Sequence, residues 1–251
     1  MQAKLFTNVV ANIVIAVLVV SLAAVASVGA TVGVFNRADN NPVYKGNRTD
    51  AVSLMVNVYW GTEYIDGFLE IFDKYDVKTT FFVGGCWAAK NPDVLAKIVG
   101  HGHEIGNHGY FHKQQSGLTV EQNMTEISSC GKVVSQLVGV NMDLFAPPGG
   151  DFGKNTLNAA EKCGYRTIMW SRDTIDWRDK DSAVVYERAT KNTSGGELIL
   201  IHPTQHTLQA RIPPVSTQKV SVRTWKSALT CCPTCISTQI CPRMNWKKNA
   251  V

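Results

Sequence analysis

The chain has 251 residues, of which 45% are hydrophobic and 18% are charged, enough for one folded domain with a full core. Its formal net charge of +5 is spread thinly, with no basic run before the last residues. This excludes a nucleic-acid-binding protein and leaves solubility, or weak attraction to an anionic wall or membrane surface.

The N-terminal segment is apolar. Residues Leu5 to Phe35 contain no Asp, Glu, Lys or Arg, and they can span a bilayer as one helix. A cleavable signal peptide has a shorter apolar region, of about 7–15 residues. We therefore expect residues 1–45 to form a single-pass membrane anchor and linker, with the bulk of the protein outside the cytoplasm. Cleavage near Ala24-Val25-Ala26, giving a secreted protein, is the alternative.

Residues 46–210 are expected to alternate between strands and helices. The expected strands are Ala51–Val58, Val77–Val83, Glu104–Asn107, Leu144–Ala146, Tyr165–Trp170 and Glu197–Pro203. The expected helices are Ile65–Tyr75, one starting at Asn91-Pro92, Leu118–Val138 capped by Thr119, Asn155–Cys163 ended by Gly164, and Ser182–Lys191. Nearly every strand is apolar throughout, which is typical of a parallel sheet covered on its outer face. The fold class is therefore α/β, with an irregular (β/α) barrel.

Histidines are concentrated in one stretch. Four of the six lie between Gly100 and His112. His108 and His112 are four residues apart, so a helical turn starting at Asn107 would aim both imidazoles the same way. Two neutral imidazoles at this spacing can bind one zinc or similar ion. The alternative is a pair of half-exposed histidines with no metal.

Unusual residues follow the expected strands. They are Asn57, Gly84-Gly85, His108, Pro147-Pro148, Asp176 and His202. Because the carboxyl ends of parallel strands meet at one edge, we expect these residues to gather at one rim, where α/β folds bind ligands. This convergence favours a metal site at the rim.

Five motifs in order resemble a known family. They are Thr79-Thr80-Phe81-Phe82-Val83, Gly102–His108 with His112, Pro147-Pro148-Gly149, Asp176-Trp177 and Leu200-Ile201-His202. Together they resemble the NodB homology domain of the polysaccharide deacetylases, carbohydrate esterase family 4, over roughly residues 46–208. Asn57–Tyr64 and Phe145–Pro148 look most like its membrane-anchored, sporulation-type branch.

The resemblance implies a deformed (β/α) barrel that hydrolyses N-acetyl groups on peptidoglycan or chitin-like glycans. It implies a divalent metal, often zinc, held by an Asp and two histidines that fall here on His108 and His112. It also implies that His202 protonates the departing amine and that Asp176 orients His202. A glycan and, through the N-terminal helix, a membrane are the expected partners.

The chain departs from the family at its acidic positions. The aspartates that serve as the base and the metal ligand fall on Asn57 and Val58. Asn cannot accept the water proton at neutral pH, and Val cannot bind a metal. The arginine that pairs with the base in the family is here Ala146. Losing both together makes physical sense, since an unpaired arginine beside a neutral amide would be costly.

Two hypotheses follow. In the first, the protein is a metal-dependent polysaccharide N-deacetylase with Asn57, Asp176 and His202 as its catalytic residues, and water or a displaced carboxylate (Glu63 or Asp66) completes the metal shell. In the second, it is a catalytically weak or inactive glycan-binding protein. The expected substrate-binding residues are Trp60, Pro148, Gly149 and Trp177; core packing is the alternative for the tryptophans.

The C-terminal region, residues 211–251, lacks the helix and closing strand that the resemblance implies. It contains four of the seven cysteines, but their spacing fits known zinc ligand patterns poorly. We expect an atypical tail that leaves a sheet edge open. The other three, Cys86, Cys130 and Cys163, are expected to be small core residues.

Overall fold

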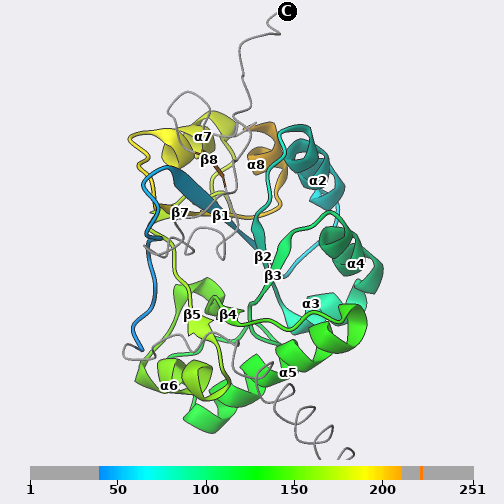
Figure 1. Ribbon diagram of the computed structural model, residues 1–251, viewed down its shortest axis with the longest axis vertical. Coiled ribbons are helices and arrows are strands. Elements are labelled where there is room, and N and C mark those ends of the chain that lie inside the picture. The colour runs from blue at the N-terminus through cyan, green and yellow to red at the C-terminus, as the bar shows by residue number, and fades with distance from the viewer. Residues whose placement is uncertain (1–39, 211–220, 223–251) are drawn as a thin grey trace, which may run out of the picture. The chain divides into compact units, whose positions relative to one another are not determined.

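The protein contains a curled sheet of parallel strands surrounded by helices (Figure 1). The computed structural model describes residues 40–210 and 221–222. The strands are β1 (Ala51–Val58), β2 (Thr80–Val83), β3 (Glu104–Asn107), β4 (Leu144–Phe145), β5 (Arg166–Thr167), β6 (Arg172–Asp173), β7 (Leu198–Ile201) and β8 (Ser221–Val222). The helices are α2 (Ile65–Lys74), α3 (Gly85–Lys90), α4 (Pro92–Gly100), α5 (Val120–Val138), α6 (Lys154–Lys162), α7 (Ser182–Thr190) and α8 (Gln205–Gln209).

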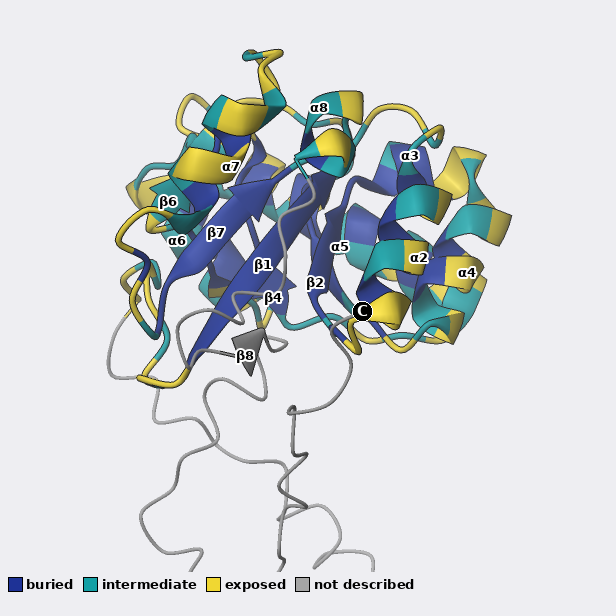
Figure 2. Cartoon of the chain, turned by 90° about the horizontal axis from the view of Figure 1, so that it is seen from above, coloured by how far each residue is buried: buried dark blue, intermediate teal, exposed yellow. Residues whose placement is uncertain are grey.

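The sheet has the strand order β5-β4-β3-β2-β1-β7-β6, and β8 adds a short parallel pairing at the start of β1. Its path runs from β5 to β6 without closing, so the fold is an α/β half-barrel and the expected barrel is corrected to this open form. β1 is the longest strand and is buried along its whole length, between β2 and β7 (Figure 2).

Side chains of β1 alternate between two apolar clusters, as the two faces of a strand require. Val52, Leu54, Val56 and Val58 join the larger cluster, which is shared with helices α2, α3 and α4. Met55 joins the smaller cluster on the inner face, with Phe82, Leu144, Ala146, Ile168, Leu198 and Leu200. β1, β2 and β7 are buried along their whole length because both faces of these strands are covered.

Several local predictions are confirmed. The Thr119 side chain accepts a hydrogen bond from the backbone N–H of Gln122, whose own side chain bonds the backbone of Thr119, and this capping box starts α5. Gly164 has φ +85° just after α6, the left-handed conformation expected there. Cys130 is fully buried, whereas Cys86 and Cys163 are half-buried.

Other elements were missed. α3 and β6 are short, and neither has enough residues to show a period in the sequence. β8 lies in the region where we expected no strand; its pairing with β1 is a tertiary contact. The helical turn predicted from Asn107 is wrong, because Gly109 and His112 have φ values of +72° and +55°.

No helix within residues 40–210 and 221–222 is long and apolar enough to cross a membrane. The predicted anchor, Leu5 to Phe35, lies outside the described residues, as does nearly all of the cysteine-containing tail.

Candidate functional site

Asn57 and His202 are brought together by the register of β1 and β7. Val56 pairs with Ile201 in this parallel ladder, so Asn57 and His202 follow at the same level. Asn57 also continues the inner face that Met55 begins. On the other side, Val83 pairs with Asn107, and the backbone N–H of His108 bonds the Val83 carbonyl at 3.0 Å. The rim predicted from the sequence therefore forms.

His108 is buried immediately after β3, with 2% of its surface exposed. Its Nδ1 lies 2.8 Å from the carbonyl oxygen of Ala146, which is an acceptor only. Nδ1 therefore carries the proton and Nε2 keeps its lone pair free. Burial lowers the pKa of His108 to about 3, and the nearby His112 and His202 act in the same direction. His108 is a neutral imidazole at physiological pH.

His112 reaches His108 from an irregular loop. Their ring centroids are 5.0 Å apart at an interplanar angle of 72°. The His112 ring also packs on Tyr59 and Trp60, at centroid distances of 4.6 Å and 4.8 Å. Burial lowers the pKa of His112, and the neighbouring His202 adds to this. The pair forms as predicted, but through a loop with left-handed residues and not through a helix.

A buried carboxylate on α5 holds this loop. Glu126 accepts hydrogen bonds from the backbone N–H groups of Tyr110 at 3.1 Å and Phe111 at 2.8 Å. Its other oxygen lies 3.2 Å from the ammonium of Lys113. Asn107 adds a further attachment, since its Oδ1 accepts from the backbone N–H of Gly109 at 2.9 Å. The sequence analysis did not identify Glu126, because the polar and apolar pattern of α5 does not distinguish a buried glutamate from a solvent-exposed one.

Asp176 and His202 form a second pair at the rim. Asp176 is 2% exposed, and its Oδ1 lies 2.7 Å from Nδ1 of His202. Its Oδ2 accepts from the backbone N–H of His202 at 2.6 Å and from the hydroxyl of Thr207 at 2.5 Å. This carboxylate therefore orients the imidazole and fixes Nδ1 as the donor.

The three residues predicted to depart from the family pattern, Asn57, Val58 and Ala146, are all buried. Asn57 is 4% exposed, and its Oδ1 has no hydrogen-bond partner among the described residues. Val58 is fully buried in the outer apolar cluster. Ala146 is fully buried in the inner cluster, and its carbonyl oxygen accepts a hydrogen bond from Nδ1 of His108.

The histidine pair fits part of a metal site. Two imidazoles bound at ~2.1 Å to one tetrahedral ion would have centroids about 5 Å apart, as observed here, although an edge-to-face ring contact gives the same spacing. Catalytic zinc sites have three protein ligands. Within the described residues, no group of three or more His, Cys, Asp or Glu side chains is placed to hold an ion. The residues present do not complete the implied site.

The two carboxylates considered as substitutes have other partners. Oε2 of Glu63 accepts from the backbone N–H of Thr62 at 3.0 Å. Asp66 lies 2.7 Å from the ammonium of Lys97 on α4. The prediction that either completes a shell with His108 and His112 is therefore wrong.

Aromatic side chains are exposed around the rim. Trp60 and Trp177 are 70% and 60% exposed, so the core-packing alternative for them is wrong. Pro148 is buried, while Gly149 is exposed with φ +62°. Phe111, which the sequence did not single out, is also exposed and lies in the histidine loop.

The remaining histidines of the cluster serve the fold. His103 is buried against Phe72 and Phe81, with centroid distances of 5.4 Å and 5.1 Å, and burial lowers its pKa to about 4. His101 lies 2.6 Å from Asp73. The histidine-rich stretch therefore contains two kinds of residue: His108 and His112 lie at the rim, whereas His101 and His103 stabilise the fold.

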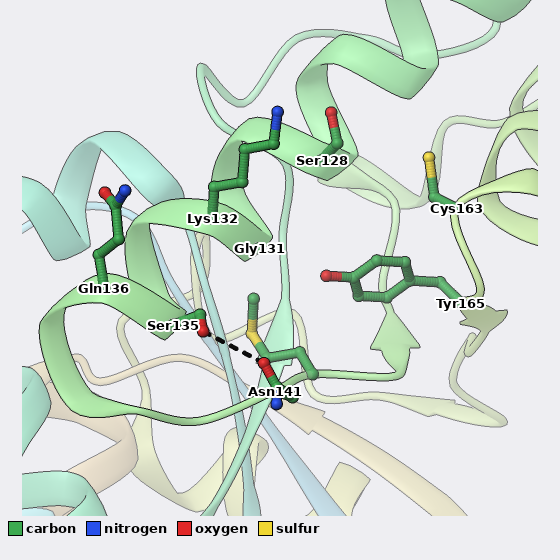
Figure 3. A pocket seen from close by; sticks show the side chains of 9 residues that line it. Ser128, Gly131, Lys132, Ser135, Gln136, Asn141, Cys163 and Tyr165 are labelled. Atoms are coloured by element: carbon green, nitrogen blue, oxygen red, sulfur yellow. Dashed lines mark hydrogen bonds between the residues drawn. The ribbon is translucent and has the colours of Figure 1, made fainter.

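A groove of about 430 Å³ lies elsewhere, between α5 and Tyr165 (Figure 3). Its lining residues are Ser128, Gly131, Lys132, Ser135, Gln136, Asn141, Met142, Cys163 and Tyr165, none of which belongs to the rim. It is separate from the predicted site.

Comparisons with known proteins agree with the motifs. Residues 45–168 match the family model described as polysaccharide deacetylase. The fold resembles the crystal structure of a CE4 family pseudoenzyme from Bacillus anthracis, with a TM-score of 0.73 and 31% identity over 76% of this chain and 69% of that one. The chain belongs to the polysaccharide deacetylases of carbohydrate esterase family 4. A mutant of that pseudoenzyme with restored enzymatic activity is equally similar in fold.

Two curated relatives are also similar to this deacetylase-family chain. It is 38% identical to the uncharacterized protein YlxY of Bacillus subtilis over 170 residues, which are 67% of this chain and 53% of that protein. It is 29% identical to a peptidoglycan-N-acetylglucosamine deacetylase of Bacillus cereus over 142 residues, 57% of this chain and 52% of the relative. The chain spans about half the length of these curated relatives.

Proposed function

We propose that this family member binds N-acetylated glycans of the peptidoglycan or chitin type at the rim, without the hydrolytic activity of the deacetylases. The observation that carries the proposal is the incomplete ligand set around His108 and His112, since no group of three or more His, Cys, Asp or Glu side chains among the described residues is placed to hold an ion. The Asn57 side chain is neutral and cannot act as a base, and the Val58 side chain is fully buried in the outer apolar cluster. The features that would contact a sugar remain.

The sugar-contacting features are aromatic and uncharged. Trp60 and Trp177 present large exposed rings, on which the apolar faces of pyranose rings can pack. The lowered pKa values of His108 and His112 keep both imidazoles neutral. Neutral imidazoles beside exposed aromatic rings suit the hydroxyl and acetamido groups of an N-acetylated sugar.

Hydrolysis of N-acetyl groups is the second candidate function, and the Asp176–His202 pair favours it. A carboxylate 2.7 Å from Nδ1 orients the imidazole, as a general acid that protonates a departing amine requires. The protein would still need a base and a third metal ligand. The resemblance to a pseudoenzyme supports the first candidate.

Two measurements separate the candidates. Isothermal titration of the full-length chain with an N-acetylglucosamine tetramer and with peptidoglycan fragments should show binding. Acetate release should stay at background in the presence of either zinc or a chelator. Acetate release that depends on added zinc and is lost in His202→Ala would establish the hydrolase instead.

Trp60→Ala tests the binding surface. We expect about tenfold weaker glycan binding, since an aromatic contact contributes about 1 kcal/mol or more. Tyr75→Ala is the matched control, because Tyr75 is 42% exposed and lies at the end of α2. Equal binding by both variants would place the glycan elsewhere.

We also propose that the protein is anchored outside the cytoplasm by the Leu5–Phe35 segment and serves sporulation; secretion after cleavage is the alternative. The support is the length of the apolar segment and the resemblance to the sporulation-type branch. Protease treatment of intact cells and of spheroplasts tests the location. Protection in both would contradict it.

A further inference from the structure

The groove beside α5 belongs neither to the rim nor to the proposed function. It has a volume of about 430 Å³ and lies between α5 and Tyr165 (Figure 3). Small-molecule sites in proteins have volumes of about 300–1,000 Å³. None of the residues that line the groove contacts the carboxylates of Asp176 or Glu126, which hold the two histidine pairs. The groove therefore has the size of a binding site that is separate from the rim.

Gly131 leaves space on the side of the groove that α5 provides. It lies in the interior of α5, where glycine is less favourable than alanine by about 1 kcal/mol. A Cβ at this position would lie 2.4 Å from the hydroxyl oxygen of Tyr165. The absence of a side chain therefore lets the Tyr165 ring reach the helix and form an aromatic wall of the groove. Met142 adds a second apolar surface.

Three polar side chains of α5 line the groove in a single row. Ser128, Lys132 and Gln136 are spaced four residues apart, so they lie on neighbouring turns of one helix face. Figure 3 shows Ser128 and Lys132 extending from the same side of α5. Within the part of the chain that the structure describes, none of these three side chains makes a hydrogen bond or an ion pair. Their donors and acceptors are therefore available to a ligand.

The lining of the groove has a positive charge. Lys132 is the only lining residue that is charged at neutral pH. Burial raises the pKa of the Tyr165 hydroxyl and that of the Cys163 thiol, so both groups stay neutral. Asp143 also acts to raise the pKa of Tyr165, but it does not line the groove. A negatively charged ligand therefore complements the lining better than a positively charged one.

We propose that the groove is a second ligand site, which binds a sugar that carries a carboxylate. Lys132 pairs with the carboxylate, and Ser128 and Gln136 form hydrogen bonds with the sugar hydroxyls. The Tyr165 ring packs against the apolar face of the sugar. An uncharged sugar would leave Lys132 without a partner, and an apolar ligand would leave the whole row of polar side chains unused. The inference goes beyond the proposed function, since the groove shares no residue with the rim.

NMR titrations of the full-length, ¹⁵N-labelled chain test this site. Glucuronic acid and N-acetylmuramic acid are each compared with an uncharged counterpart, glucose and N-acetylglucosamine. At least one acid should bind about fivefold more tightly than its counterpart, because it alone can pair with the exposed ammonium of Lys132. Changes in chemical shift should centre on residues 128–136 and 165, and the preference should weaken at high salt. The acid that is preferred identifies the source of the carboxylate.

Lys132→Gln removes the charge and keeps a polar side chain on α5. The preference for the acid should be lost, while the affinity for the uncharged sugar stays unchanged. Lys90→Gln is the matched control, because Lys90 is an exposed lysine at the end of α3 and does not line the groove. Gln136→Ala is a second variant that should fold, since alanine favours a helix, and it should weaken binding of the acid about threefold.

The outcomes separate this inference from the proposed function. Equal affinities for each acid and its counterpart, or shift changes centred on the rim, would overturn the groove site and leave the rim to be judged by the tetramer titrations. An equal loss in Lys132→Gln and Lys90→Gln would indicate a general attraction between charges and would also overturn it. The preference should persist in Trp60→Ala, which alters only the rim, even if the N-acetylglucosamine tetramer does not bind.

Discussion

Asp176→Asn should destabilise the fold because one buried carboxylate receives three hydrogen bonds. The donors are the backbone N–H and the Nδ1 of His202, at 2.6 Å and 2.7 Å, and the hydroxyl of Thr207. A hydrogen bond to a charged group contributes about 1.5–3 kcal/mol, against about 0.5–1.5 kcal/mol for a neutral one. The amide also turns one acceptor into a donor.

The expected loss follows from that difference. If the amide oxygen takes the place of Oδ2, two bonds become neutral at a cost of about 1 kcal/mol each. The amide nitrogen then faces Nδ1 of His202, which must lose its proton to accept. We therefore expect a decrease in the free energy of unfolding of about 2–3 kcal/mol, within the range for a broken buried network.

Urea denaturation at pH 7 measures this loss. Thr207→Val removes one of the three donors and should cost about 1 kcal/mol. Asp66→Asn is the matched control, because the Asp66–Lys97 ion pair is exposed and should contribute less than about 1 kcal/mol. A change under about 0.5 kcal/mol for Asp176→Asn would refute the argument that this carboxylate is an essential buried acceptor.

Three further predictions concern the surroundings of the site. The pKa of His103 is about 4 in the folded chain and about 6.5 when unfolded, so the unfolded state binds more protons between these values. The neutral His103 therefore contributes about 3 kcal/mol to the free energy of unfolding above pH 6.5, and this contribution is lost as the pH falls toward 4. The unfolding free energies of the native chain and of His103→Gln should accordingly converge in acid. Glu126→Gln should cost about 1–3 kcal/mol and speed amide hydrogen exchange at Phe111; unchanged exchange would exclude a fastening role. Gly131→Ala should destabilise, because its Cβ would lie 2.4 Å from the Tyr165 hydroxyl; a higher melting temperature, as helix propensity alone predicts, would contradict this contact.

The main elements could be predicted because their signals are local. β1 and β3 have the predicted bounds, and α5 starts at its predicted Thr119 cap. Continuous apolar runs, helical periodicity and capping chemistry lie within a few residues of one another in the chain. β6 and β8 could not be predicted, since two-residue strands exist only through their pairing with β7 and β1.

In the candidate site, too, the local features could be predicted and the tertiary contacts could not. The spacing of His108 and His112 indicated a pair, yet the helix inferred from it does not exist. Their rings meet in a loop in which Gly109 and His112 have left-handed φ values and the backbone N–H groups of Tyr110 and Phe111 bond Glu126. A carboxylate sixteen positions from Tyr110 leaves no periodic signal in the sequence.

The sequence alone determined the family and indicated the rim at the carboxyl ends of the strands; the replacement of two acidic residues by Asn57 and Val58 stays a prediction. Those facts depend on residue identity and order. Only the tertiary structure decided that Val58 is sealed in the outer core, that Asn57 keeps an unused acceptor on the inner face, and that Glu63 and Asp66 do not replace the missing ligand. The physical reason is that burial and hydrogen-bond partners depend on which strands and helices pack together, and these lie far apart in the chain.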